Sequence, residues 1–227
     1  MIWYRTLASL TMFMVAAFIV CPAQNLQTGV SVNLPAVNNA TAVPEADKDD
    51  ALIVTVAADG VAFLGTEPVS ISQLRDKLSG TRLLSMRKVY IKADARTRYA
   101  DVEKVLISVE AAGAKNPILL VAQREVPQPG IVVPPRGFQV AVSLSSTSSQ
   151  PIVLQLLSSG QPSPTLLLND QRVSWIELPS SVERVLHSRG TKAVELRADG
   201  VLAFSDVVRA IDLSRSVGAD VVLIPQA

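Results

Sequence analysis

The sequence predicts an α+β protein made of two tandem copies of a small ββαβαβ-type domain, which follow one N-terminal apolar helix. The first observation is an internal repeat. The motif Val-Tyr-Ile-Lys-Ala-Asp ends at Asp94, and Val-Glu-Leu-Arg-Ala-Asp ends at Asp199, 105 residues later (199 − 94). The second is that helix-type spacing of apolar residues follows both motifs, and each run closes on Gly-Ala, at 113–114 and 218–219. Two long repeats indicate a duplicated domain, because a solenoid requires three or more short ones.

Looser matches extend the repeat upstream. Leu64, Val69, Leu74 and Leu78 match Leu168, Val173, Leu178 and Val182 at an offset of 104 (168 − 64). The runs Leu52–Val56 and Ile152–Leu156 resemble each other, and so do the alternating triplets Val30, Val32, Leu34 and Val140, Val142, Leu144. The changing offsets indicate loop insertions between shared elements.

Local patterns predict the elements of the first copy. Leu52–Val56 and Val61–Leu64 are β-rich runs that flank the turn sequence Ala-Asp-Gly at 58–60, which is typical of a hairpin. Ser70 is a predicted N-cap for a helix that ends at Gly80. A second helix follows the 89–94 strand. Its predicted buried face consists of Tyr99, Val102, Val105, Leu106 and Val109.

The chain of 227 residues is therefore divided into four segments. Residues 1–23 are a transmembrane anchor or signal segment, 24–123 the first domain, 124–136 a linker and 137–227 the second domain. The linker contains four prolines, and Pro-rich linkers are semi-rigid spacers. We expect it to hold the two domains apart.

The run Leu7–Cys21 contains no charged residue, and three interpretations of it compete. A spanning helix needs about 20 mostly apolar residues, so it would include Ile2–Tyr4. A cleaved signal peptide fits Arg5, the apolar run and a small-residue site at Ala23. A buried soluble helix is the least favoured interpretation, because the segment is apolar on all sides. Either of the first two places the rest of the chain outside the cytoplasm.

Composition excludes several functional classes. The formal net charge is +1, so no basic excess favours nucleic-acid binding. The single cysteine, Cys21, excludes an internal disulfide. No phosphate-binding loop, nucleophile elbow or Cys/His cluster is present, and His187 is the only histidine. The prediction is a non-enzyme with no catalytic residues, no cofactor and no metal site.

Candidate partner-binding residues lie on predicted edge strands and at strand ends. We expect Val30, Val32 and Leu34 on one edge strand and Pro117–Val121 on another, because an open edge is a template for strand addition. Asp94 and Asp199 each end a strand, where they either bind a partner or cap backbone N–H groups of the turn; capping is the favoured interpretation.

Other charged residues have structural explanations. Asp101 and Asp206 lie in predicted first helical turns, where the helix dipole favours negative charge. Lys92 and Arg197 are strand residues that alternation places on the outward, solvated face. His187 is expected at an exposed helix end.

These pieces, in this order, resemble the ExbD/TolR family. They are the N-terminal apolar run, the triplet ending at Leu34, Ile53–Val56 with Asp59-Gly60, Phe63–Gly65, and the 89–94 strand with Tyr99, Val102 and the Ala-Gly-Ala at 112–114. The match covers nearly all of residues 7–122. It implies a single-pass inner-membrane protein with periplasmic domains, here two ExbD/TolR-like copies, in a proton-driven biopolymer transport complex.

The resemblance also implies partners and one departure. The expected partners are an ExbB/TolQ-like multispanning membrane protein, a TonB-like protein or peptidoglycan, and further copies of the same chain. Family members carry a transmembrane aspartate for proton relay, which would fall near Ala8 or Ser9. No Asp or Glu precedes Glu45, so we expect an accessory subunit with no proton-relay residue. The alternative is a secreted periplasmic protein- or peptidoglycan-binding module without a motor role.

Overall fold

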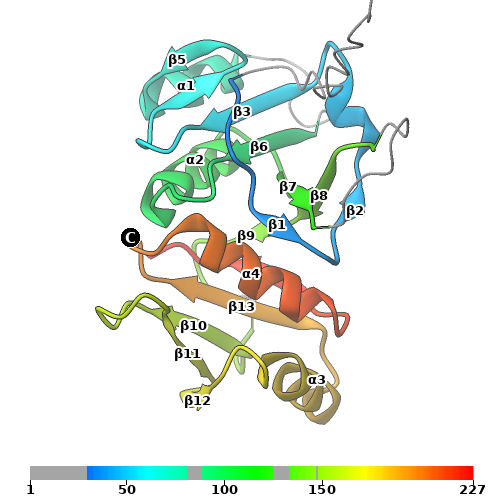
Figure 1. Cartoon of the computed structure of the whole chain (residues 1–227). Helices are drawn as coiled ribbons and strands as arrows, with labels where there is room; N and C mark the ends of the chain where they lie inside the picture. Colours follow the sequence, from blue (N-terminus) through cyan, green and yellow to red (C-terminus); the bar gives the residue numbers. More distant parts are fainter. Residues whose placement is uncertain (1–29, 81–87, 125–132, 147, 227) are drawn as a thin grey trace, which may run out of the picture.

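The computed structural model describes residues 30–80, 88–124, 133–146 and 148–226. These residues form two β-sheets and four α-helices, arranged as two stacked halves (Figure 1). The mixed α+β class predicted from the sequence is confirmed. The predicted N-terminal helix lies outside the described residues.

The first half contains a sheet with the strand order β2-β8-β7-β6-β3-β4-β5, and β1 pairs with β7. Its strands are β1 (Ala36–Val37), β2 (Thr41–Ala42), β3 (Leu52–Val56), β4 (Ala62–Leu64), β5 (Glu67–Val69), β6 (Val89–Ala93), β7 (Ile118–Gln123) and β8 (Arg136–Gln139). Its helices are α1 (Ile71–Ser79), α2 (Tyr99–Ala111) and the short 3-10 helix η1 (Pro44–Asp47).

The second half contains a sheet with the order β12-β11-β10-β13-β14-β9. Its strands are β9 (Ala141–Val142), β10 (Val153–Leu157), β11 (Thr165–Leu168), β12 (Gln171–Val173), β13 (Ala193–Ala198) and β14 (Asp220–Leu223). Its helices are α3 (Leu178–Arg189) and α4 (Phe204–Arg215).

The two sheets share one arrangement of five strands. The orders β5-β4-β3-β6-β7 and β12-β11-β10-β13-β14 correspond strand by strand, with the same parallel and antiparallel pairings. The register equates Ile53 with Val153, since they pair with Tyr90 and Glu195, which are 105 residues apart (195 − 90). The origin of the halves by duplication stays a prediction.

Local sequence explains how the first half folds. Gly60 has a φ of +86°, which glycine adopts without steric cost, and it closes the predicted hairpin between β3 and β4. Ser70 caps α1 as predicted: its Oγ accepts the Gln73 N–H, and the Gln73 side chain accepts the Ser70 N–H.

The two predictions of an edge strand, at residues 30–34 and at residues 117–121, are both wrong. Residues 30–35 form no strand, because the ladder with β7 begins only after Pro35, at Ala36. The carbonyls of Asn33 and Pro35 instead accept single bonds from Ala95 and Ala122. Strand β7 is interior, because it pairs with β6 in parallel on one side and with β8 in antiparallel orientation on the other.

The outer face of the first sheet, opposite its helices, is covered rather than solvated. A small cluster forms there from Ile53, Tyr90, Ile118 and Leu120 under Val43 and Ala46, with Leu34 and Ala51 packed against it. Lys92 lies on this face and is only 5% exposed, and burial lowers its pKa. Alternation placed Lys92 on the correct face, but its predicted solvation is wrong because residues 34–51 fold over that face.

The two halves pack directly against each other. Helices α2 and α4 lie between the sheets (Figure 1), and one continuous hydrophobic cluster contains buried residues from both halves. The sheet of the first half also gains β8, which follows the predicted linker. The prediction that the linker holds the halves apart is therefore wrong; residues 125–132 of it lie outside the described part of the chain.

Candidate functional site

The turns that precede α2 and α4 join the two halves through reciprocal hydrogen bonds. Arg98 and Ala203, which occupy the same position in the two repeats, form an antiparallel bridge. The backbone bonds around it are Tyr99 N–H to Leu202 O (2.8 Å), Phe204 N–H to Thr97 O (2.8 Å), Ala100 N–H to Gly200 O (2.9 Å) and Ser205 N–H to Ala95 O (3.0 Å). Each bond has a counterpart with the halves exchanged, so the contact has local two-fold symmetry.

Two buried carboxylates add contacts between the halves. Asp212 of α4 accepts the N–H of Asn39 at 2.8 Å and that of Asn38 at 3.2 Å. Glu103 of α2 accepts the N–H of Gln226 at 2.9 Å, and burial raises the pKa of Glu103. Each helix thus binds a backbone segment of the opposite half.

Asp94 performs the capping role favoured from the sequence. The residue is 2% exposed, and its carboxylate accepts hydrogen bonds from the N–H of Asn33 (3.0 Å), the N–H of Arg96 (3.0 Å), Arg96 Nε (2.9 Å) and Arg96 Nη2 (3.2 Å). The hydrogen bond from the Arg96 side chain is the main cause that lowers the pKa of Asp94 to about 2. Because its acceptor sites face the chain itself, Asp94 supports the N-terminal segment rather than presenting a free carboxylate.

Asp199 also binds backbone, but at a different place. Its Oδ2 accepts the Ser158 N–H at 2.6 Å and holds the loop after β10. The structure therefore brings the two repeat-equivalent turns together while the two aspartates serve separate loops. Whether either carboxylate binds a partner stays a prediction.

The remaining predicted residues are distributed over the surface and the core. Val30 and Val32 are half-buried, and Leu34 packs on the outer-face cluster. Ala8 and Ser9, the expected positions of a relay carboxylate, lie outside the described residues. Arg197 is half-buried, with an ion pair to Glu195 at 3.2 Å, so its predicted full solvation is wrong.

The first-turn aspartates and the histidine occupy the predicted kinds of position. Asp101 is in the first turn of α2 with Arg98 and Lys104 within ion-pair distance, and Asp206 is in the first turn of α4, where burial raises its pKa. His187 is exposed in the last turn of α3, and its Nδ1 lies 2.9 Å from the Glu183 carbonyl oxygen.

Strand β12 is an open edge that sequence reasoning missed. Asn169 and Asp170, both with positive φ, form a two-residue turn between β11 and β12. In such a hairpin the flanking pair, Leu168 and Gln171, is hydrogen-bonded and the next pair is not. The backbone N–H and C=O of Arg172 therefore point outward, away from β11.

The corresponding edge of the first sheet, strand β5, lacks a backbone donor at the outward position. There the turn at 65–66 joins β4 to β5, and Pro68 pairs with Phe63 at the position that Arg172 holds in β12. Proline has no N–H, so β5 offers no donor at the outward position. The 104-residue offset equates Pro68 with Arg172, and this contrast was available in the sequence.

A hollow of about 450 Å³ adjoins the β12 edge. Arg172, Val173 and Trp175 line it, and Ile176 beside it is 92% exposed. The Trp175 indole donates to Ser163 Oγ at 3.0 Å, and the Arg209 guanidinium lies 4.4 Å from its ring centroid. The edge thus combines open backbone groups with an adjoining hollow, and strand-addition sites use both features.

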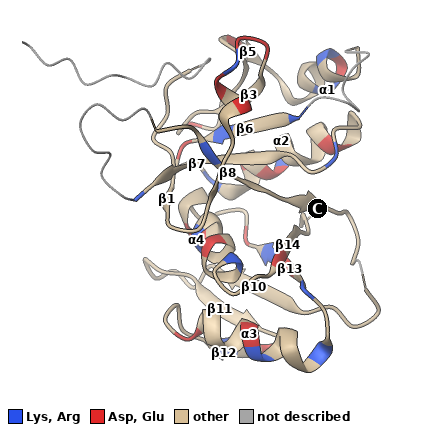
Figure 2. Ribbon diagram, turned by 90° about the vertical axis from the view of Figure 1, so that its right-hand side faces the viewer, with Lys and Arg blue, Asp and Glu red and all other residues tan. Residues whose placement is uncertain are grey.

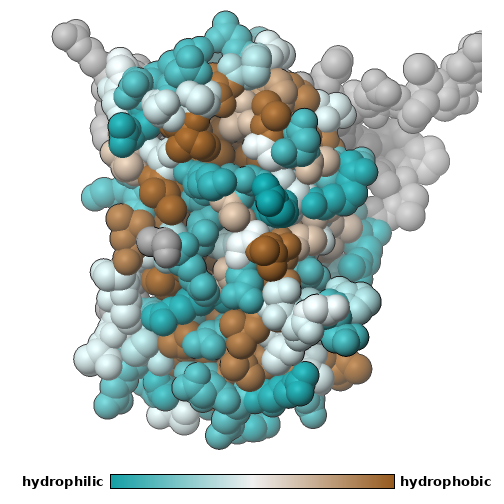
Figure 3. Space-filling view, turned by 90° about the vertical axis from the view of Figure 1, so that its left-hand side faces the viewer, coloured by the Kyte–Doolittle hydropathy of each residue, from teal (hydrophilic) through white to brown (hydrophobic). Residues whose placement is uncertain are grey.

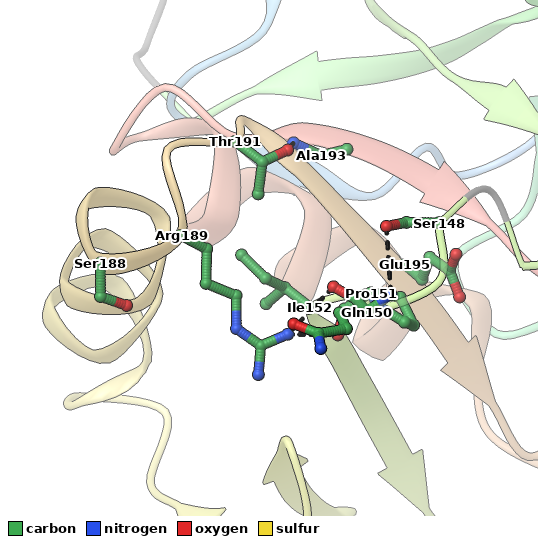
Figure 4. A pocket seen from close by; sticks show the side chains of 9 residues that line it. All are labelled: Ser148, Gln150, Pro151, Ile152, Ser188, Arg189, Thr191, Ala193 and Glu195. Carbon is green, nitrogen blue, oxygen red and sulfur yellow. Dashed lines mark hydrogen bonds between the residues drawn. The ribbon is translucent and has the colours of Figure 1, made fainter.

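A second polar hollow lies at the end of α3. Figure 4 shows the Arg189 side chain extending from the helix toward Gln150 and Pro151; Thr191 and Ala193 lie above it in this view, and Glu195 lies beyond Gln150. Its volume is about 350 Å³.

The surface chemistry of the described residues is mixed. Basic and acidic residues are interspersed over both halves in the view of Figure 2. On the face shown in Figure 3, hydrophobic residues form small patches separated by hydrophilic ones. Within the described part of the chain, no group of three or more His, Cys, Asp or Glu side chains could hold a metal ion.

None of the helices among the described residues is long and apolar enough to cross a bilayer, and the run Leu7–Cys21 lies outside these residues.

The chain is similar to a known protein family. The model of the family described as biopolymer transport protein ExbD/TolR matches residues 7–124. No curated protein matches the chain, and no solved structure does. The matched region contains the apolar run at residues 7–21 and most of the first half, and it is more than half of the sequence. The chain therefore belongs to the ExbD/TolR family.

Proposed function

We propose that this protein is an accessory, membrane-anchored subunit of a complex that uses the proton-motive force for biopolymer transport. The observation that carries the proposal is the family match over residues 7–124. ExbD/TolR proteins are non-enzymatic, inner-membrane proteins with periplasmic domains, and they work with ExbB/TolQ and TonB/TolA-like partners. In this proposal residues 7–21 are the anchor, and both halves are periplasmic.

The accessory role is supported by the charge content of the N-terminal segment. No Asp or Glu lies before Glu45, so the apolar run offers hydroxyl groups such as that of Ser9 but no carboxylate. A hydroxyl group hydrogen-bonds but does not titrate near neutral pH. Proton movement would then belong to another subunit, and this chain would transmit or receive force through its folded halves.

The relation between the halves supports a duplicated domain that acts as an internal dimer. The five-strand arrangement is the same in both, and the contact around Arg98 and Ala203 exchanges equivalent bonds. A closed two-fold contact uses the same surface from each partner. We infer that one chain supplies the paired unit for which two single-domain chains would otherwise be needed.

Partner capture is assigned to strand β12. Its open N–H and C=O at Arg172 suit an extended segment of a partner protein, and the hollow beside Trp175 suits an apolar side chain of that segment. Because Pro68 lacks an outward N–H on β5, the binding edge is assigned to the second half. Val30, Val32, Leu34, Asp94 and Asp199 then support the fold rather than touch the partner.

Purification from membranes tests the transport role. The full chain should co-purify with an ExbB/TolQ-like multispanning protein after mild detergent extraction, and its mass should correspond to a chain that begins at Met1. Recovery from membranes without any multispanning partner would contradict the motor-subunit assignment.

A secreted binding module is the second candidate function. The missing N-terminal carboxylate and the small-residue site at Ala23 favour it. It predicts a soluble periplasmic protein whose mass corresponds to a start at Gln24. The same mass measurement on membrane and soluble fractions decides between the two functions.

A further inference from the structure

The outer face of the second sheet is half-exposed along β10, whereas the equivalent face of the first is covered. In the first half, residues 34–51 bury Ile53 and Tyr90. In the second half Val153, the equivalent of Ile53, and Gln155 on the same strand are half-exposed. A charged residue replaces an aromatic one there, since Glu195 occupies the position of Tyr90; Glu195 is buried and accepts a hydrogen bond from Ser146 Oγ at 2.7 Å. The second half therefore presents a polar, half-exposed surface along β10, beside the buried Glu195 that Ser146 contacts.

Two adjoining hollows lie along this face and share the residues around Arg189. One, of about 550 Å³, is lined by Gln155 and Asn169 together with Arg189 and Arg197. The other, of about 350 Å³, lies on the side of Thr191 and Glu195 (Figure 4). Hollows of this size accommodate a small ligand or a few residues of a peptide.

Arg189 is a positioned cation without a carboxylate partner. Its Nη1 donates to the carbonyl oxygens of Gln150 (3.0 Å) and Pro151 (2.9 Å), and among the described residues it forms no ion pair. The two carbonyls hold the guanidinium in place while Nε and Nη2 remain available. A guanidinium held in this way loses little further side-chain entropy when it binds a ligand.

The rest of the lining supplies donors and acceptors, and the acceptors include the carboxylates of Glu195 and Asp170. The Nε of Arg197 is buried and has no hydrogen-bond partner, although its Nη2 contacts Glu195. Asn169 Oδ1 accepts the Val153 N–H at 2.9 Å, so its NH₂ group is left for a ligand. Asp170, also in the lining, is exposed and can accept an N–H.

We propose that this face binds a carboxylate group of a short peptide segment, with Arg189 as the main contact. Guanidinium groups match the two oxygens of a carboxylate in a bidentate geometry. The amides of Gln155 and Asn169 and the carboxylate of Asp170 complement the N–H and C=O groups that surround a carboxylate in a peptide. The carboxylate comes from a peptide C-terminus or from an acidic side chain. The site is separate from the β12 edge and does not depend on the transport role.

Calorimetric titration of the full-length chain in detergent tests the proposal with three peptides. The first is acetyl-Ala-Ala-Ala with a free C-terminal carboxylate, and the second is the same peptide amidated. The third is acetyl-Ala-Glu-Ala-amide, whose carboxylate is a side chain. At about 50 mM salt, where screening is weak, we expect millimolar or tighter binding of the first or third peptide and none of the second.

Matched variants connect binding to Arg189. Arg189→Gln should weaken binding at least about tenfold, because a hydrogen bond to a charged group is lost. Arg184→Gln removes an exposed arginine of the same helix and should change the affinity for the peptide less than about twofold. Circular dichroism verifies that both variants are folded.

Every outcome of these titrations either supports or overturns the proposal. Binding of only one carboxylate peptide supports the proposal and identifies the source of the carboxylate. Equal binding of the amidated peptide, unchanged affinity in Arg189→Gln, or no binding of either carboxylate peptide at about 10 mM would overturn it. Failure here leaves the co-purification test of the transport role unaffected.

Discussion

Asp94 connects the N-terminal segment to the first sheet. Four donors from Asn33 and Arg96 converge on its buried carboxylate. These contacts stabilise the ionised form, and they are stronger than the opposing effect of burial. A single ionised side chain thus orders a stretch that is not part of any strand.

The lowered pKa of Asp94 makes stability depend on acid pH. Its folded-state pKa of about 2 lies below the ordinary value of 3.8, so the stabilisation is present above about pH 4 and is lost as the pH falls toward 2. We expect Asp94→Asn to lower the free energy of unfolding by about 2 kcal/mol at neutral pH and by much less near pH 2. Urea denaturation at several pH values measures both, with exposed Asp76→Asn as the control. A pH-independent difference would contradict the expectation.

Strands β5 and β12 differ at one position that decides whether the strand edge can pair with a further strand. Both are three-residue edge strands, but Pro68 and Arg172 differ in whether they carry an N–H. Edge strands that expose donors and acceptors invite pairing, and proline prevents it.

Substitution at Arg172 tests strand addition. Arg172→Pro should abolish capture of the partner because it removes the outward N–H, whereas Arg172→Ala retains the N–H and should reduce capture only about twofold. The fold tolerates proline at the equivalent Pro68, so both variants should fold. Pull-down from detergent-solubilised membranes with the full chain as bait measures capture. Equal capture by Arg172→Pro and the unmodified chain would exclude this edge.

The turns before α2 and α4 leave little room for larger side chains. A Cβ on Gly200 would lie 2.8 Å from the Cβ of Ala100, closer than two carbons pack. Gly200→Ala should therefore destabilise the protein by about 1–3 kcal/mol. The double variant Gly200→Ala with Ala100→Gly restores the space. Its free energy of unfolding should therefore be higher than the sum of the two single changes predicts. Additive effects in urea denaturation would mean that this contact does not limit the packing.

For the whole molecule, the continuous core predicts cooperative unfolding. The hydrophobic cluster includes residues of both halves, and the halves exchange backbone bonds. Neither half can then unfold while leaving the other fully packed.

Two spectroscopic probes test this cooperativity. In a Trp3→Phe background, Trp175 reports only on the second half, while far-UV circular dichroism reports on both. We expect the two urea transitions to coincide. Separate midpoints would show that the halves unfold independently, and Gly200→Ala is the variant in which separation should appear first.

Much of this fold could be predicted from the sequence, because its elements depend on neighbours within a few residues. The hairpin at Gly60 and the cap at Ser70 follow from local backbone preferences. The repeat predicted that both halves alternate strands and helices alike, and alternation placed Lys92 on the outer face. Membership of the ExbD/TolR family was likewise evident from ordered motifs spread along the first half.

Only the tertiary structure decided which surfaces are open. Lys92 is buried because residues 34–51 return over its face, and β7 is interior because β8 adds to it after the linker. The contact between Arg98 and Ala203, and the half-exposed face beside Arg189, depend on how distant segments meet. Periodicity determines which side of a strand a residue faces, but exposure depends on what the rest of the chain places against that side.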